Sequence, residues 1–171
     1  LWLKEEIKGK GALLAGLDQN IRAVQEIELI KELLSEEENL QVPKKEWKEV
    51  IWQHRFWKIV HLCGHGHFNL EKRGMESWVE VQRERVYAQD LLKKGPVAEF
   101  VFLHACSTGR VYEHLGELWG FPFAVLGNGS RSCLLAFNPV DAQTAPEFAE
   151  RFYKSLLSGA DRSTAVAEAM R

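Results

Sequence analysis

A histidine and a cysteine of this chain each follow an apolar segment and lie in a glycine-containing turn. His65 stands between Gly64 and Gly66, just after the apolar run that ends at Leu62. Cys106 follows a second apolar run and precedes a turn of small residues. A thiolate attacks a carbonyl carbon, and such a nucleophile needs a neighbouring histidine to manage the protons. These residue types, placed in this way, indicate nucleophilic cysteine chemistry.

The backbone of the same two turns is suited to a second task. Attack on a carbonyl creates an oxyanion, which backbone N–H donors stabilise. Glycine adopts backbone conformations closed to other residues and lets a ligand approach closely. We therefore expect the amides of Gly66 and Cys106 to form an oxyanion hole beside the thiol.

The elements that must position these residues alternate between apolar strands and helices. Strands are expected at residues 11–17, 56–62, 100–103 and 132–137, with a short edge strand or hairpin arm at 78–81. Helices are expected at residues 21–34, 44–53, 88–94, 144–157 and 162–170, with a shorter one before the turn at 127–129. The apolar stripe of the first helix comprises Ile21, Val24, Ile27, Ile30, Leu33 and Leu34.

This alternation predicts an α/β fold with a mostly parallel sheet and helices on both faces. In such sheets, functional sites form just beyond the carboxyl ends of the strands. His65 and Cys106 both follow an expected strand. If the two strands are neighbours in the sheet, the turns that carry His65 and Cys106 lie side by side.

Composition narrows the class of protein. The chain has 171 residues, of which 46% are hydrophobic and 27% charged, as in ordinary globular domains. A net charge of −2 gives no basic surplus for binding nucleic acid directly. The apolar runs are too short to span a bilayer, and the N-terminal residues lack the layout of a signal peptide. Three cysteines do not make a disulfide framework, so we expect a reducing, cytoplasmic location.

The motifs around the two residues resemble those of a known family. The pattern His-x-x-Gly-His-Gly at residues 61–66, followed by Leu-x-Ala-Cys-Ser-Thr-Gly at 103–109, is similar to the CHAT domain. CHAT domains share a protease clan with caspases, separases, gingipains and clostripain. Residues 13–16 and the helix after them, with Glu26 and Glu28, resemble the opening of that domain. Residues 152–159 and 165–171 resemble its closing helices, so residues 11–171 are expected to form the domain and residues 1–10 an N-terminal extension.

The resemblance implies a caspase-like fold and a thiol protease activity that needs no cofactor. His65 and Cys106 match the catalytic dyad of the family, and Gly66 matches the oxyanion position. The expected function is that of a cysteine endopeptidase acting on a protein or peptide substrate. The resemblance also implies control by a partner, such as tetratricopeptide repeats or another regulatory module.

Asp141 is the sequence candidate for contacting the substrate. Separases and gingipains, which the chain resembles, cleave after basic residues, and this specificity calls for a carboxylate. Asp141 follows the expected strand 132–137, in a segment that often lines the pocket in this clan. Two alternatives stand beside this hypothesis. The carboxylate of Asp141 is also suited to the start of the next helix. In addition, the family's tryptophan is replaced here by Phe137, which would leave a wider, apolar pocket.

A zinc site is an alternative use of the same region. Four residues of ligand type alternate along the chain: His61, Cys63, His65 and His67. In a continuous strand they would share one face and, with Cys106, could bind zinc. Gly64 and Gly66, however, indicate that the strand ends between them.

A second alternative is a domain that binds a partner and performs no catalysis, since fold alone does not confer activity. The intact pair of His65 and Cys106 favours the enzyme over this interaction module.

Overall fold

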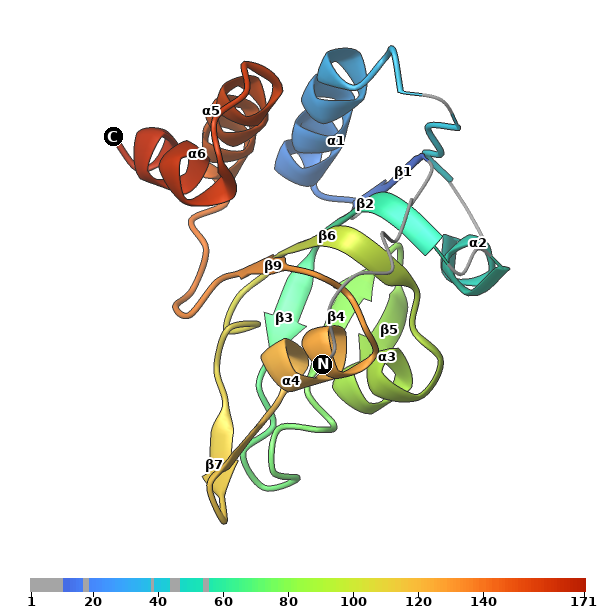
Figure 1. Ribbon diagram of the computed structural model, residues 1–171, viewed down its shortest axis with the longest axis vertical. Coiled ribbons are helices and arrows are strands. Elements are labelled where there is room, and N and C mark those ends of the chain that lie inside the picture. The colour runs from blue at the N-terminus through green and yellow to red at the C-terminus, as the bar shows by residue number, and fades with distance from the viewer. Residues whose placement is uncertain (1–10, 17–18, 38, 44–46, 54–55) are drawn as a thin grey trace, which may run out of the picture.

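A four-stranded parallel sheet forms the centre of the molecule (Figure 1). The computed structural model describes residues 11–16, 19–37, 39–43, 47–53 and 56–171. The strands lie in the order β1 (Ala12–Gly16), β2 (Phe56–Cys63), β6 (Val97–His104) and β9 (Cys133–Leu135). All three pairings are parallel. The α/β fold with a mostly parallel sheet, predicted from the sequence, is confirmed.

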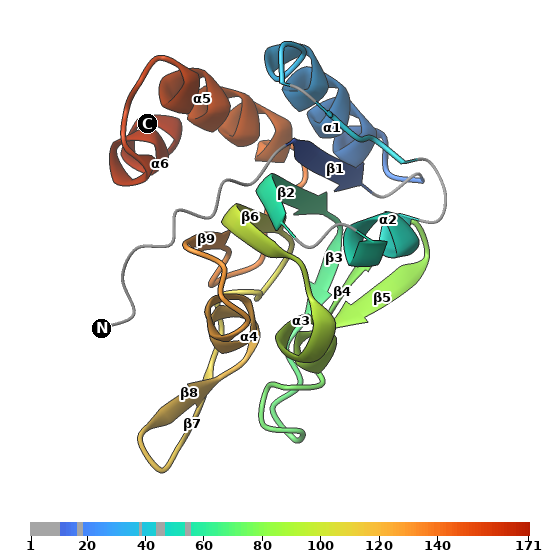
Figure 2. The same cartoon turned by 45° about the vertical axis from the view of Figure 1, so that its right-hand side comes forward.

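Helices cover both faces of this sheet (Figure 2). One face carries α1 (Ile21–Leu33), α5 (Ala145–Leu157) and α6 (Arg162–Ala169), and the other carries α2 (Trp47–Gln53), α3 (Ala88–Lys94) and α4 (Phe121–Gly127). Successive strand residues point to opposite faces, so each strand feeds two cores. In β1, Leu13 packs with the α2–α4 layer and Leu14 with the α1–α5 layer.

Beyond the carboxyl end of β2 the chain turns into a smaller antiparallel sheet. Its strands are β3 (His65–His67), β4 (Trp78–Val81) and β5 (Glu84–Tyr87). The change of sheet occurs at Gly64, where a Cβ atom would lie 2.1 Å from the carbonyl oxygen of Glu80. Only a residue without a side chain allows the chain at the end of β2 to approach the Glu80 backbone in β4 so closely. Gly64 therefore marks the point where the chain leaves β2, and His65 lies on β3.

Some elements differ from the sequence expectation. The strand expected at 132–137 is only β9, and its residues are half-buried. The glycine-rich stretch around Gly116 forms a hairpin of β7 (Tyr112–His114) and β8 (Glu117–Trp119). This hairpin turns through Leu115 and Gly116, which both have positive φ angles.

The apolar stripe of α1 is also rotated from the expected one. Ile21 and Val24 are 81% and 42% exposed. The buried residues of the helix are Ala23, Glu26, Ile27 and Ile30. The pattern of apolar residues does not predict this buried face, because one residue of the face is a glutamate.

Within the described residues, no helix has both the length and the apolar character needed to cross a membrane.

Candidate active site

The turns that carry His65 and Cys106 lie side by side, as the sequence predicts. β2 and β6 are adjacent, and Cys63 is paired with His104 at their carboxyl ends. Beyond this pair, Gly66 packs against Cys106: a Cβ atom at Gly66 would lie 2.1 Å from the carbonyl oxygen of Cys106 and 2.9 Å from its amide nitrogen. The backbones of the two expected oxyanion donors are therefore in direct contact.

The turn that presents Cys106 is held by a buried hydroxyl. Thr108 Oγ1 lies 3.1 Å from the carbonyl oxygen of Leu103 and 3.0 Å from that of Ala105, and it accepts a hydrogen bond from the Ala136 N–H at 3.0 Å. These contacts tie the end of β6 to the residue that follows β9. They fix the direction in which the chain leaves the sheet at Cys106.

The thiol of Cys106 differs from the other two in its surroundings. It is half-buried, and its Sγ atom lies 3.3 Å from the Val140 amide nitrogen, which donates to it. Cys63 is buried, and burial together with the nearby Glu26 carboxylate raises its thiol pKa. Burial also raises the thiol pKa of Cys133. Because the thiolate is the nucleophile, Cys63 and Cys133 are the less reactive candidates.

A cavity of about 180 Å³ opens beside Cys106. Its walls come from the first turns of α1, the ends of β2 and β6, His65, and the segment that leads into α5. The lining residues are Asn20, Arg22, Ala23, Glu26, Cys63, Gly64, His65, His104, Cys106, Val140, Ala142 and Ala145. The cavity therefore brings Cys106 and His65 to one space large enough for a side chain.

The two histidines of β3 have different surroundings. Both are exposed, but His65 lines the cavity and His67 does not. The ring of His67 stacks on Trp78, with 5.4 Å between the ring centroids. Of these two histidines, only His65 shares the lining of the cavity with Cys106.

Asp141 lies next to the cavity but is not among its lining residues. Its carboxylate is exposed and accepts a hydrogen bond from the Gln143 N–H at 2.9 Å. Its carbonyl oxygen accepts from the Ala145 N–H, at the start of α5. The neighbours of Asp141 on both sides, Val140 and Ala142, do line the cavity. Asp141 therefore stands at the rim, in a turn that leads into the helix.

A buried polar cluster under the site was not predicted from the sequence. The carboxylate of Glu26, from α1, accepts hydrogen bonds from two imidazoles on neighbouring strands. Its Oε1 atom lies 2.9 Å from His61 Nε2 and 2.6 Å from His104 Nδ1. Cys63 Sγ donates to Oε2 at 3.4 Å, and the Tyr153 hydroxyl lies 3.2 Å from His61 Nδ1. The signal that could have revealed it is a glutamate among the apolar residues of an amphipathic helix.

Hydrogen bonding keeps Glu26 ionised in spite of its burial. Burial acts to raise the pKa of this carboxyl, but the hydrogen bonds from His104 and His61 outweigh it and lower the pKa to about 2. Burial lowers the pKa of His61, which the contact with Glu26 only partly opposes. Burial and the Glu26 charge raise the pKa of the Tyr153 hydroxyl. The cluster therefore holds a buried carboxylate, beside a His61 whose charged form is disfavoured by burial.

The structure separates the residues of the alternative zinc site. His61 and Cys63 share the buried face of β2, whereas His65 and His67 lie beyond Gly64 on exposed β3. Within the described residues, the possible ligand atoms of Glu26, His61 and His104 do lie within 4.8 Å of one another. Both ring nitrogens, however, lie at hydrogen-bonding distance from one carboxylate oxygen. Ligands about 2.1 Å from a tetrahedral zinc ion would be roughly 3.4 Å apart. The contacts of the cluster are therefore those of a hydrogen-bonded network.

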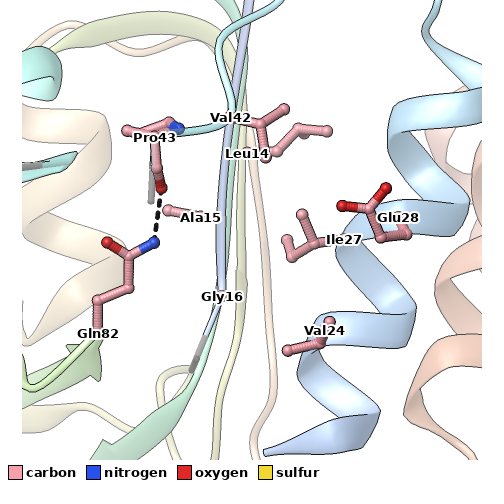
Figure 3. Close-up of a pocket in the computed structure, with 9 residues that line it drawn as sticks. All are labelled: Leu14, Ala15, Gly16, Val24, Ile27, Glu28, Val42, Pro43 and Gln82. Carbon is pink, nitrogen blue, oxygen red and sulfur yellow. Dashed lines mark hydrogen bonds between the residues drawn. The ribbon is translucent and has the colours of Figure 1, made fainter. Parts of the chain in front are cut away.

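A second and larger cavity has no comparable chemistry (Figure 3). It has a volume of about 350 Å³ and lies at the edge of β1, against α1. Its walls are mainly apolar, with Glu28 on one side and Gln82 on the other. The Gln82 side chain donates to the carbonyl oxygen of Pro43 at 2.6 Å. Among the described residues that line this cavity there is no thiol or imidazole, so the cavity beside Cys106 remains the candidate for the predicted chemistry.

Substitution of Gly66 by alanine tests how closely the two turns must approach. The added methyl group overlaps the Cys106 backbone, so the turns must separate. We expect a destabilisation of about 1–3 kcal/mol, typical of overpacking, and loss of reactivity at Cys106. Thermal unfolding and thiol labelling measure the two effects. The control is Gly127→Ala in α4, where the methyl group meets only the end of the Leu92 side chain. Unchanged stability and labelling in Gly66→Ala would contradict the close approach.

Comparison with known proteins agrees with these observations. A family model, the CHAT domain, matches residues 14–171. None of the curated proteins compared with the chain matches it.

Proposed function

The chain belongs to the CHAT domain family, and from that premise we propose that it is a cysteine endopeptidase that uses Cys106 and His65. One observation carries the proposal: Cys106 and His65 line the same cavity, at the carboxyl ends of adjacent parallel strands. The caspase-like α/β fold of the family is consistent with this activity. The proposal of peptide-bond hydrolysis rests on the residues at the site, Cys106 and His65.

The proposed reaction has two stages. The Cys106 thiolate attacks the carbonyl carbon of the scissile peptide bond, and the amides of Gly66 and Cys106 stabilise the oxyanion. His65 donates a proton to the leaving amine, and a thioester remains on Cys106. A water molecule then hydrolyses the thioester, releases the carboxylic acid and restores the thiol. The contact between the Gly66 and Cys106 backbones supports the placement of the two oxyanion donors side by side.

We assign Asp141 a contribution to substrate binding at the rim of the cavity. Its exposed carboxylate lies between two lining residues, Val140 and Ala142, so a long side chain leaving the cavity would pass close to it. An exposed ion pair of this kind contributes about 0–1 kcal/mol. The role of Asp141 is therefore secondary to that of the cavity itself.

The proposal extends to the setting of the enzyme. We expect a protein or peptide substrate in the cytoplasm and control by a partner or a regulatory module such as tetratricopeptide repeats. A domain that only binds a partner is the alternative, and it requires that Cys106 have no enhanced reactivity.

Selective alkylation distinguishes an enzyme from an inactive module. Iodoacetamide is expected to label Cys106 ahead of Cys63 and Cys133, because burial raises the pKa of both other thiols. Mass spectrometry of peptides from briefly treated native protein measures the three rates. Labelling of the denatured protein is the control, since all three thiols should then react alike. Slow labelling of Cys106 in the native protein would favour the interaction module.

A further inference from the structure

The small antiparallel sheet has a buried face and a solvent face, and His65 lies on the solvent face. The three strands of this sheet lie side by side in Figure 2. Val79, Val81 and Val86 are buried in the core on one side. Side chains alternate along a strand, so the residues next to these valines point the other way. The residues of this second face are His65, His67, Trp78, Glu80, Arg85 and Tyr87.

Glu80 lies directly opposite His65 on this face. The two residues are paired in the antiparallel register of β3 and β4. Side chains paired in this way have Cβ atoms about 4.5–5.5 Å apart. The position of Glu80 is also fixed by the close approach at Gly64, where a Cβ atom would lie 2.1 Å from the Glu80 carbonyl oxygen. A glutamate side chain spans the distance to its paired residue, so the Glu80 carboxylate can reach the imidazole of His65.

The Glu80 carboxylate is oriented by a charged partner on the next strand. Arg85 Nε donates to Glu80 Oε2 at 2.9 Å. The Arg85 guanidinium in turn lies over the ring of Trp78, 4.1 Å from its centroid. An ionised carboxylate can accept several hydrogen bonds, and the bond from Arg85 uses one of its two oxygens. Arg85 therefore holds Glu80 in place and leaves it able to accept from a second donor.

A carboxylate beside a catalytic imidazole has a defined effect. When one ring nitrogen of a histidine donates to a carboxylate, the ring is held in one orientation, and its protonated form is stabilised. His65 needs both properties to deliver a proton to the leaving amine. Hydrogen bonds of this kind are often long or poorly aligned before the substrate binds, and they tighten in the reacting complex.

We propose that Glu80 is a positioning residue for His65, whose second ring nitrogen donates to the Glu80 carboxylate while the first serves the leaving amine. The proposal rests on the endopeptidase function and adds a residue that acts through His65. Glu80 differs in this from Glu26, the carboxylate of the buried cluster, which accepts from His61 and His104 in the core.

Two substrates with one acyl sequence separate this role from a structural one. The acyl part is that of the fastest-cut peptide of a library, carried as a para-nitroanilide or as a thiobenzyl ester. The amine that leaves the anilide must gain a proton, whereas the thiolate that leaves the ester needs none. In Glu80→Gln, we expect kcat/KM for the anilide to fall about 10- to 100-fold, the cost of a misplaced catalytic group, and kcat/KM for the ester to change less than about threefold.

Three further variants test whether Glu80 acts through His65. In a His65→Ala background, Glu80→Gln should cause no further loss on the anilide, because residues that act as a unit are not additive. Arg85→Gln keeps the carboxylate and should lose less than Glu80→Gln. Glu84→Gln is the matched control, since it makes the same change in the same sheet at a residue paired with Val81, and it should keep both rates. Thermal melts verify that each variant is folded.

The outcomes separate this inference from the proposed function. An unchanged anilide rate in Glu80→Gln, or an equal loss on anilide and ester, would overturn the inference alone. The same holds if Glu80→Gln has its full effect in the His65→Ala background, or if Arg85→Gln loses as much as Glu80→Gln. If the wild type cuts no peptide of the library and acts on neither substrate, the endopeptidase function is overturned, and this inference with it.

Discussion

Replacing Cys106 with alanine is expected to lower the rate of peptide cleavage by about 10⁴-fold or more, as loss of the nucleophile does in covalent hydrolases. The substitution removes the only atom that can form the thioester. The fold should survive, because Cys106 is half-buried in a turn and losing one sulfur atom leaves a small cavity. The hydroxyl of Thr108, which holds the turn, remains in place. Cleavage of a peptide library, with mass-spectrometric mapping of the cut sites, measures the loss.

Cys133→Ala is the matched control for this experiment. It removes the same atom from another half-buried cysteine, one that does not line the cavity. Activity close to that of the wild type is expected for this variant. Comparable turnover in Cys106→Ala and the wild type would refute the assignment of the nucleophile.

Replacing His65 with alanine has the second largest expected effect. The leaving amine must gain a proton as the peptide bond breaks, and loss of a general acid costs about 10²–10⁴ in rate. Because His65 is exposed on a short strand, the change should leave stability almost unaltered. Steady-state kinetics on the same peptide, together with a thermal melt, separate the two effects.

His67→Ala serves as the control because His67 is the other exposed histidine of β3. It stacks on Trp78, away from the lining of the cavity, so only a small loss is expected. If His67→Ala were the more severe change, the general acid would be the other histidine of the pair. His61→Ala is a less suitable comparison because it also breaks the buried cluster.

The alternation of strands and helices predicted both the fold and the side-by-side placement of the two turns. The prediction succeeds because an apolar run followed by glycine is a local sequence signal for the end of a buried strand. The parallel sheet then brings the carboxyl ends of such strands to the same edge. The cluster of Glu26, His61 and His104 escaped prediction because its members come from three separate elements. Nothing in the neighbouring sequence of Glu26 shows that two imidazoles will satisfy its carboxylate.

The position of Asp141 shows a different limit. Its sequence neighbourhood supports both a substrate contact and a turn before a helix. Whether the Asp141 side chain lines the cavity or lies at its rim depends on the direction in which it points. That direction depends on the turn that hydrogen bonds from the Gln143 and Ala145 amides stabilise.

The buried cluster has a consequence for when, during folding, the proposed active site forms. Its hydrogen bonds join residues 35, 78 and 92 positions apart in the chain. Contacts between such distant residues form late, because the entropy lost in closing the intervening loops must be offset by other contacts first. A nascent or partly unfolded chain therefore has a cysteine and a histidine but no shaped cavity beside them. For the proposed peptidase, such a chain should be inert toward neighbouring proteins until the sheet has closed.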